Sequence, residues 1–222
     1  MKKTKLILHI FLALTVIFFC SCGSSSSFGR NKSSESIAVV TIGNQVWTSK
    51  NLNVDTYSNG DSIPQVQDPI KWANLSTGAW CYYDNDTSNG NKYGKLYNWY
   101  AVHDTRGLAP KGYHLSTAAD WEKLTHYLGG ELQPGTGSKM KSTSGWNNDG
   151  NGTNISGFSG LPAGCRGTDG SFYNIYEYGY WWSTIEDSTR DETLYILHYK
   201  IGISEAYDPQ KKCGFSVRCL KD

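Results

Sequence analysis

Two irregular stretches of the chain carry side chains of the kinds that recognise sugars. In the first, an indole ring is followed by two amides and a carboxylate, and in the second, tyrosines lie among polar residues. Aromatic rings stack on sugar rings while amides and carboxylates hydrogen-bond to hydroxyl groups, so both stretches indicate a ligand-binding surface. Gly and Asn clusters also form turns in any fold, and a plain loop is the favoured interpretation of the first stretch. The candidate ligand-binding residues are Trp146, Asn147, Asn148, Asp149, Tyr173 and Tyr176.

A second group of polar side chains has the chemistry of a calcium loop. Asp84 and Asp86 precede Ser88, Asn89 and Gly90, and hard cations bind such alternating oxygen ligands. Asp84 and Asp86 are therefore the candidate metal ligands. However, the glycine falls one position late for an EF-hand, and no Glu follows at the end of the loop, so a solvated turn is favoured.

The sequence gives little indication of catalysis. The histidines that follow the amino-terminal region have no His-x-x-x-His or His-Glu-x-x-His spacing, so a zinc centre would need ligands from distant segments. No nucleophile elbow, phosphate-binding glycine loop or paired-carboxylate motif is present. Neither a catalytic residue nor a cofactor other than calcium is predicted. The histidines are His103, His114, His126 and His198.

The amino terminus has the pattern of an export signal. Lys2, Lys3 and Lys5 precede an apolar run over residues 6–19, which is too short to cross a bilayer core of about 30 Å. Small Ser21 lies before Cys22, as cleavage requires, and this arrangement resembles the lipobox of bacterial lipoproteins. We therefore expect residues 1–21 to be a signal peptide and Cys22 to be a lipidated amino terminus.

The segment that follows is expected to be a tether. Residues 22–36 are rich in Ser and Gly and have almost nothing to bury, so ordering them would cost backbone entropy without return. Gly23 replaces the aspartate that retains many lipoproteins in the inner membrane, which favours the outer membrane. Cleavage removes three of the 21 basic residues and none of the 20 acidic residues, which leaves a net charge near −2. Nucleic-acid binding is thus disfavoured.

A single domain is expected over residues 37–222, and one helix anchors it. Thr117 and Asp120 have capping-box spacing, Trp121 and Leu124 belong to an apolar stripe of helical period, and Gly129 suits a helix end. The pattern predicts a helix from Ser116 to Leu128. Short apolar runs elsewhere alternate with turn residues and predict strands, which gives an α+β domain with short antiparallel strands and one clear helix.

The other expected elements are distributed along the whole domain. A hairpin is expected at the start, and the middle of the domain contains a strand with a turn-rich loop, then a strand or short helix, then a long irregular region. Trp99, Trp121 and either Trp181 or Trp182 are expected in the core. The ranges are Val39–Trp47, Gly78–Gly90, Tyr93–Val102 and Gln133–Gly170, followed by strands at Gly179–Thr184, Thr193–Tyr199 and Cys213–Leu220.

Six ordered motifs in this domain are familiar as a set. They are Trp47 with Lys50–Asn53, Tyr93–Trp99, Gly112–Leu115, Gly157–Ser159, Gly179–Thr184 and Gly214–Cys219. Together they resemble the Fibrobacter succinogenes major paralogous domain family, from about Ile37 to Asp222. The resemblance implies a bacterial envelope or secreted module, often a lipoprotein, without an established activity. More remotely, the helix and the last strand look like the fold shared by C-type lectins and formylglycine-generating enzymes, which implies a single C-type-lectin-like domain with long irregular loops.

Four cysteines of the domain, Cys81, Cys165, Cys213 and Cys219, are expected to form disulfides in an exported protein. Cys213 and Cys219 are six residues apart in a strand-like run, roughly 20 Å, so they cannot pair with each other. Two connectivities remain open. Many proteins of the family that the chain resembles have a cysteine where Ala109 stands, as the partner of the one matching Cys219. The resemblance therefore implies that Cys81 replaces that partner, which leaves Cys165 to pair with Cys213.

These expectations together favour a non-catalytic binding module, anchored by lipid in the cell envelope and facing extracellular glycan or protein. Two alternatives stay open. One is an exported enzyme on a scaffold like that of formylglycine-generating enzymes, and the other is a purely structural envelope protein. The binding module needs only an aromatic and amide-rich loop surface, whereas the enzyme needs activated groups that no motif identifies.

Overall fold

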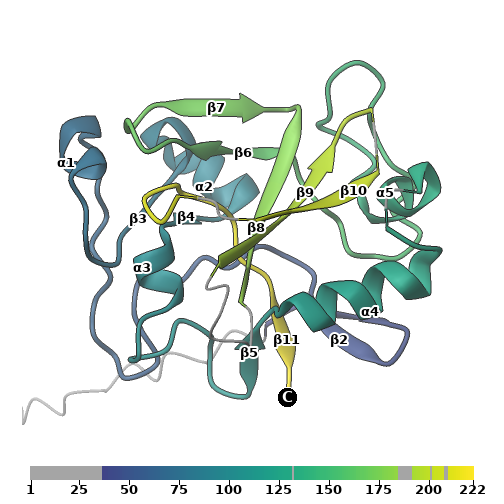
Figure 1. The fold of residues 1–222 in the computed structure, drawn as a ribbon, viewed down its shortest axis with the longest axis horizontal. Helices are drawn as coiled ribbons and strands as arrows, with labels where there is room; N and C mark the ends of the chain where they lie inside the picture. Colours follow the sequence, from purple (N-terminus) through teal and green to yellow (C-terminus); the bar gives the residue numbers. More distant parts are fainter. Residues whose placement is uncertain (1–36, 132, 185–191, 201, 208–209) are drawn as a thin grey trace, which may run out of the picture. The chain divides into compact units, whose positions relative to one another are not determined.

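The computed structural model describes residues 37–131, 133–184, 192–200, 202–207 and 210–222 (Figure 1). These residues belong to one compact unit, Ser36–Asp222. The expected signal peptide, the tether and Cys22 lie outside the described residues. Within the described part, the fold is mixed α and β, with many short strands and few helices. None of its helices has the length and apolar character needed to cross a membrane.

The first sheet has four strands and joins the two ends of the domain. Its amino-terminal hairpin confirms the predicted one, and Gly43 occupies the turn with a φ of +61°. All neighbouring strands in this sheet are antiparallel. The strands in order across it are β1 (Val39–Ile42), β2 (Gln45–Thr48), β11 (Cys219–Lys221) and β5 (Tyr113–Leu115).

The second sheet has five strands and includes one parallel pair. The late strands were predicted, but the expectation of antiparallel strands alone is wrong, because Gly164 of β6 pairs in parallel with Gly179 of β8. The reason is the path of the chain: β7 turns back along the outer side of β6, and β8 then returns on the inner side. The strands in order are β10 (Ile203–Tyr207), β9 (Glu192–His198), β8 (Tyr178–Thr184), β6 (Ala163–Arg166) and β7 (Phe172–Ile175).

The segment over residues 213–218 connects these sheets with a third, which consists of β3 (Trp80–Cys81) and β4 (Leu96–Tyr97). Gly214 forms an isolated bridge to β6, Phe215 to β4 and Ser216 to β8. The chain then continues into β11 of the first sheet. Figure 1 shows this yellow segment crossing the middle of the domain. A single carboxyl-terminal segment thus touches every sheet.

The structure contains several short helices in addition to the one expected. Asp68, Asp86 and Asn98 cap α1, α2 and α3 by accepting hydrogen bonds from backbone amides. These helices are too short for a helical period to appear in the sequence, and the capping residues were their only local signal. The helices are α1 (Pro69–Ala73), the 3-10 turn η1 (Tyr83–Asn85), α2 (Thr87–Tyr93), α3 (Trp99–Val102), α4 (Ala118–Leu128) and α5 (Pro134–Met140).

Helix α4 confirms the predicted anchor. Asp120 N donates to Thr117 Oγ1 at 3.2 Å and Thr117 N donates to Asp120 Oδ2 at 3.0 Å, which closes the capping box. The ring of Trp121 stacks on Tyr195 of β9 with 4.8 Å between centroids. Leu124 is fully buried in the same cluster. Trp99 and Trp121 are buried as predicted, and of the two alternatives Trp181 and Trp182, both are buried.

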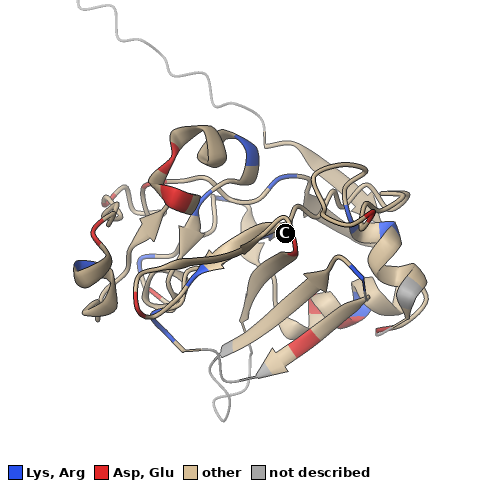
Figure 2. Ribbon diagram, turned by 90° about the horizontal axis from the view of Figure 1, so that it is seen from above, with Lys and Arg blue, Asp and Glu red and all other residues tan. Residues whose placement is uncertain are grey.

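Charged residues do not concentrate on one element. Figure 2 shows Lys and Arg interspersed with Asp and Glu over the described loops, helices and strands.

We predict that Leu124→Ala destabilises the domain by about 2 to 5 kcal/mol, because the side chain is 0% exposed and its removal leaves a cavity. Glu122→Ala on the exposed side of the same helix is the control and should change stability by less than about 0.5 kcal/mol. Chemical denaturation measures both. Equal midpoints for Leu124→Ala and the unsubstituted protein would contradict the packing of α4.

Candidate functional site

The indole of Trp146 is not available to a ligand. Its exposed fraction is 5%, and its Nε1 donates to Ser142 Oγ at 3.0 Å and to the Gly160 carbonyl at 3.3 Å. It packs in the same cluster as Leu124. The expectation that Trp146 offers a surface ring is therefore wrong, because its hydrogen bonds and apolar neighbours draw it into the core.

Four of the predicted ligand-binding residues come together at the surface. Asn147, Asn148 and Asp149 are exposed in a turn, and Asn148 and Asp149 have positive φ angles. Asn147 N donates to the carbonyl of Tyr176, whose side chain is 42% exposed. Tyr173 lies on β7, where its hydroxyl donates to Asp169 at 2.6 Å. Tertiary structure thus brings part of the predicted set together, around a turn.

The predicted calcium loop serves as a helix start. Asp86 accepts from Ser88 N at 2.8 Å and from Ser88 Oγ at 2.7 Å, as the cap of α2. Asp84 is exposed in the preceding 3-10 turn with a φ of 53°. No group of three or more His, Cys, Asp or Glu residues suited to a metal ion occurs in the described ranges.

The four cysteines are free thiols in the structure, so the expected disulfides are not formed there. Cys81 lies in one hydrophobic cluster and Cys219 in another, so their predicted pairing has no support. Cys165 and Cys213 pack together in the Cys219 cluster, and their pairing stays a prediction. Burial raises the pKa of Cys81, Cys165 and Cys219 to about 12.

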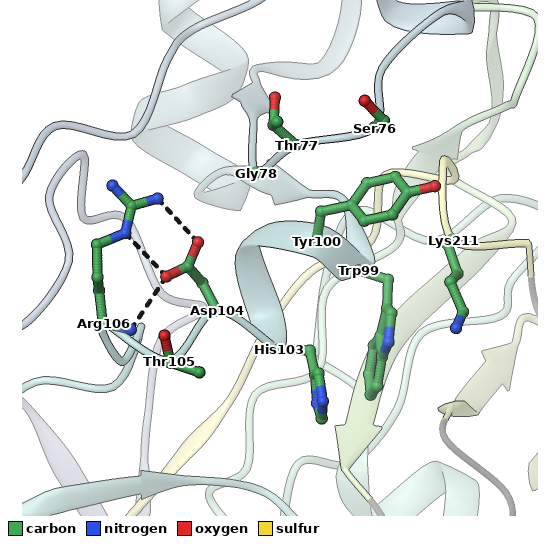
Figure 3. Close-up of a pocket in the computed structure, with 10 residues that line it drawn as sticks. All are labelled: Ser76, Thr77, Gly78, Trp99, Tyr100, His103, Asp104, Thr105, Arg106 and Lys211. Carbon is green, nitrogen blue, oxygen red and sulfur yellow. Dashed lines mark hydrogen bonds and ion pairs between the residues drawn. The ribbon is translucent and has the colours of Figure 1, made fainter.

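A hollow of about 370 Å³ beside α3 combines aromatic rings with polar groups (Figure 3). Its walls come from the loop before β3, from α3 and the turn after it, and from one residue near the carboxyl-terminal segment. The lining residues are Ser76, Thr77, Gly78, Trp99, Tyr100, His103, Asp104, Thr105, Arg106 and Lys211.

Asn98 holds two walls of this hollow together. Its Oδ1 accepts from Ala79 N at 2.9 Å and from Ala101 N at 3.0 Å, and its Nδ2 donates to the Thr77 carbonyl at 2.9 Å. The same side chain thus caps α3 and fixes the loop that carries Thr77 and Gly78. A Cβ at position 78 would collide with the Tyr57 hydroxyl, so only glycine fits there.

The aromatic wall is formed by α3 and by His103, the residue that caps its carboxyl end. The rings of Trp99 and His103 stack at 5.5 Å with 14° between their planes. Trp99 is buried and His103 is exposed, so the pair extends from the core to the solvent. Tyr100 is half-buried beside them and points toward Lys211 in Figure 3.

The opposite wall is an ion pair. Arg106 donates through Nε and Nη2 to the two oxygens of Asp104, each at 2.8 Å, and its guanidinium lies 4.1 Å from the centre of the Tyr57 ring. The hydrogen bonds from Arg106 lower the pKa of Asp104 to about 2. A third contact joins Arg106 Nη1 to Asp61 at 3.3 Å. The two-point geometry fixes polar groups in place, while their charges largely cancel.

His114 lies between two carboxylates elsewhere on the domain. Its Nδ1 is 2.8 Å from Asp222 Oδ1 and its Nε2 is 3.3 Å from Asp120 Oδ2. Asp120 also completes the capping box of α4, so these contacts support the helix start and the end of β11. Nothing in this arrangement supplies a nucleophile.

The model of the Fibrobacter succinogenes major domain matches residues 40–221, which includes the hollow and every sheet. The chain belongs to this family. No curated protein and no solved structure matches it. In this Fibrobacter succinogenes major domain, the Tyr93–Trp99 motif supplies β4, the Asn98 cap and the ring of Trp99.

Sequence reasoning missed the hollow. His103 was noted only for its lack of metal spacing. The available signals were the four-residue step from Trp99 to His103 and the Asp-x-Arg spacing of Asp104 and Arg106. Neither signal is specific for a binding site. The hollow also needs the distant loop over residues 76–78, which the hydrogen bonds of Asn98 hold against α3.

We predict that Cys165 and Cys213 of this family member pair in an oxidising compartment while Cys81 and Cys219 stay reduced. Gly214 and Arg166 exchange both backbone hydrogen bonds, which holds the segment that begins at Cys213 beside β6 and its Cys165, within one cluster. Peptide mapping without reduction tests this. A bridge between Cys81 and Cys219 would contradict it.

Proposed function

We propose that this protein is a non-catalytic binding module, anchored by lipid in a bacterial cell envelope, and that the hollow beside α3 binds one sugar unit of an extracellular glycan. The observation that carries the proposal is the combination in Figure 3 of an aromatic wall with polar groups that are already fixed. Sugar rings have apolar faces and hydroxyl edges, and the hollow offers matching partners for both.

The size and charge of the hollow support a small, neutral group. Its volume of about 370 Å³ is near the lower end for ligand pockets. The charges of Asp104 and Asp61 balance those of Arg106 and Lys211, and Asp104 and Arg106 retain oxygens and N–H groups that can meet hydroxyl groups. Their positions are set before a ligand arrives, which lowers the entropy lost on binding. Binding of this kind needs no metal, so we expect it to persist in the presence of a chelator.

The state of the thiols supports binding rather than catalysis. A thiol is nucleophilic as its thiolate, and burial that raises the pKa to about 12 keeps Cys219 protonated at neutral pH. Cys219 is also fully buried. An enzyme that acted through Cys213 and Cys219 would need both thiols to be accessible and activated.

The proposal includes a C-type-lectin-like arrangement of the domain. It is supported by the pairing of β2 with β11, which joins the two ends of the domain, and by the packing of α4 near that sheet. Fold analogy of this type says nothing about the ligand. The ligand class therefore depends on the hollow alone.

A first experiment tests the lipid anchor. Cys22→Ser should move the protein from the membrane to the soluble fraction, because stable anchoring needs acyl chains that only Cys22 is expected to carry. Membrane fractionation with immunoblotting measures the distribution, and Ser24→Ala in the tether is the control. Retention of Cys22→Ser in the membrane at the processed size would contradict the anchor.

A second experiment tests the hollow. Tyr100→Ala should weaken glycan binding by about fivefold, since a ring stacked on an apolar face contributes of the order of 1 kcal/mol. Titration calorimetry with ligands chosen from a glycan array, with calcium and with chelator, measures this effect. Tyr127→Ala is a matched control, because Tyr127 is 65% exposed on α4 and does not line the hollow. Equal binding by Tyr100→Ala and the unsubstituted protein would exclude the hollow as the site.

A further inference from the structure

Strand β1 is a free edge of the four-stranded sheet. The strand order β1-β2-β11-β5 places it at the outside of the sheet, where β2 is its neighbour. Thr41 in this strand is exposed, and Val39 is 44% exposed. Ile37, which lies just before the strand, is 38% exposed. Two of the large apolar side chains at the surface of the described residues therefore lie along this one edge.

The hairpin of β1 and β2 shows which peptide groups face outward. Ile42 and Gln45 flank its two-residue turn as a hydrogen-bonded pair, and Ser49 N donates to the Ala38 carbonyl at 2.9 Å. Bonded residues alternate along an antiparallel pair, so every second residue of β1 points its amide and carbonyl at β2 and the others point theirs away. The outward-facing residues are Ile37, Val39 and Thr41.

The outward peptide groups are available for pairing. In the described part of the chain, no turn, loop or helix end contributes a backbone hydrogen bond to the N–H or C=O of Val39 or Thr41. A row of such groups at a sheet edge is a template for a further strand. The geometry of β1 thus indicates an edge that another strand can extend.

The other edge strands of the two large sheets have features that oppose such pairing. β5 has only three residues, β10 carries the charge of Glu205, and Asn174 interrupts β7 with a φ of 62°. Short length, charge and an irregular backbone all protect a sheet edge. β1 has no charged residue, and its four residues are all β-branched, which favours strand pairing.

We propose that β1 pairs antiparallel with β1 of a second copy of this chain, about a two-fold axis at Val39. Val39 then lies opposite the partner subunit's Val39, and Ile37 lies opposite the partner subunit's Thr41. In this register the outward amides and carbonyls of both edges bond to each other. The pairing goes beyond the proposed glycan binding and does not depend on it.

The side chains at this edge suit a second copy. Successive side chains of a strand alternate between its faces, so Ile37, Val39 and Thr41 share one face. Opposed β-branched side chains pack well across two strands, and no like charges meet in this register. A two-fold axis makes every contact twice, so one exposed apolar edge covers another of the same kind.

The length of the preceding chain allows both copies to stay on one membrane. Residues 23–36 separate the predicted lipid anchor from Ile37, and 14 residues span up to about 46 Å when extended. The two copies of Ile37 would lie roughly 13 Å apart along the paired strands. Copies on one membrane also meet at a raised effective concentration, which supports an interface as small as a strand pair.

Cysteine cross-linking of the full chain, in membranes of cells that express it and with copper–phenanthroline as oxidant, tests the proposal. Val39→Cys should give a disulfide-linked dimer on non-reducing gels, because the opposed Cα atoms would be about 5.5 Å apart. Thr41→Cys is the matched control. It is exposed on the same face of β1, but its two copies would lie roughly 13 Å apart. The unsubstituted chain controls for the native cysteines.

A second substitution tests the hydrogen bonds of the edge. Thr41→Pro removes an outward N–H and leaves the hydrogen bonds to β2 in place. Added to Val39→Cys, it should reduce the dimer band by about tenfold or more, because each copy loses one hydrogen bond. Thr41→Val in the same background keeps the amide and should leave the band unchanged. Melting temperatures show whether the variants remain folded.

The outcomes decide between a second copy and any other contact. A dimer band in Val39→Cys that Thr41→Pro removes supports the pairing. No band in Val39→Cys overturns it, and so does an equal band in Thr41→Cys, which shows contact without register. A band that survives Thr41→Pro, or a cross-link to a different protein, also overturns it. These results do not depend on the binding measured with Tyr100→Ala, so the two proposals can fail separately.

Discussion

The contact between Asn51 and Arg218 is the interaction on which the rest of the structure depends. Arg218 is fully buried, and its Nε donates to Asn51 Oδ1 at 2.8 Å while Nη1 donates to the Thr48 carbonyl. The same Asn51 oxygen accepts from Trp181 Nε1 at 2.9 Å, and the Asn51 amide donates to the Tyr93 carbonyl at 2.8 Å. One amide thus joins the end of the first hairpin, α2, β8 and the last segment of the chain.

A buried cation of this kind is stable only when oxygens and ring faces replace its water. Burial lowers the pKa of Arg218, yet an arginine stays charged in proteins, so the partners must be held in position. The Phe158 ring, 4.4 Å from the guanidinium, and the Ser159 carbonyl complete the set. Arg166 repeats this arrangement with three backbone carbonyls from two loops and with the ring of Trp72. Both arginines fix loops that have little regular structure of their own, which is how a domain of short strands keeps defined surfaces.

The hollow beside α3 lies at the edge of an aromatic core. Trp99 of the hollow is 5.2 Å from Trp182, which is 4.7 Å from Phe215, which in turn is 5.4 Å from Tyr180 of β8. The buried ring of Trp99 restrains the exposed ring of His103, because the two rings stack. The same packing that stabilises the domain thus also holds one wall of the hollow in place.

The sequence by itself determined the elements whose signals are local. The Thr117 and Asp120 capping box, the stripe through Trp121 and Leu124, the first hairpin and the late strands depend on neighbours a few residues away, and the six motifs were enough to indicate the family. Only the tertiary structure decided which surfaces those elements form. Trp146 turned inward because Ser142 and Gly160 offer its indole N–H two acceptors, and Cys81 and Cys219 fell into separate clusters. The hollow arose because Asn98 ties a loop some 20 residues away to α3. These outcomes depend on contacts between distant segments, and no local pattern of residue types encodes the path that brings such segments together.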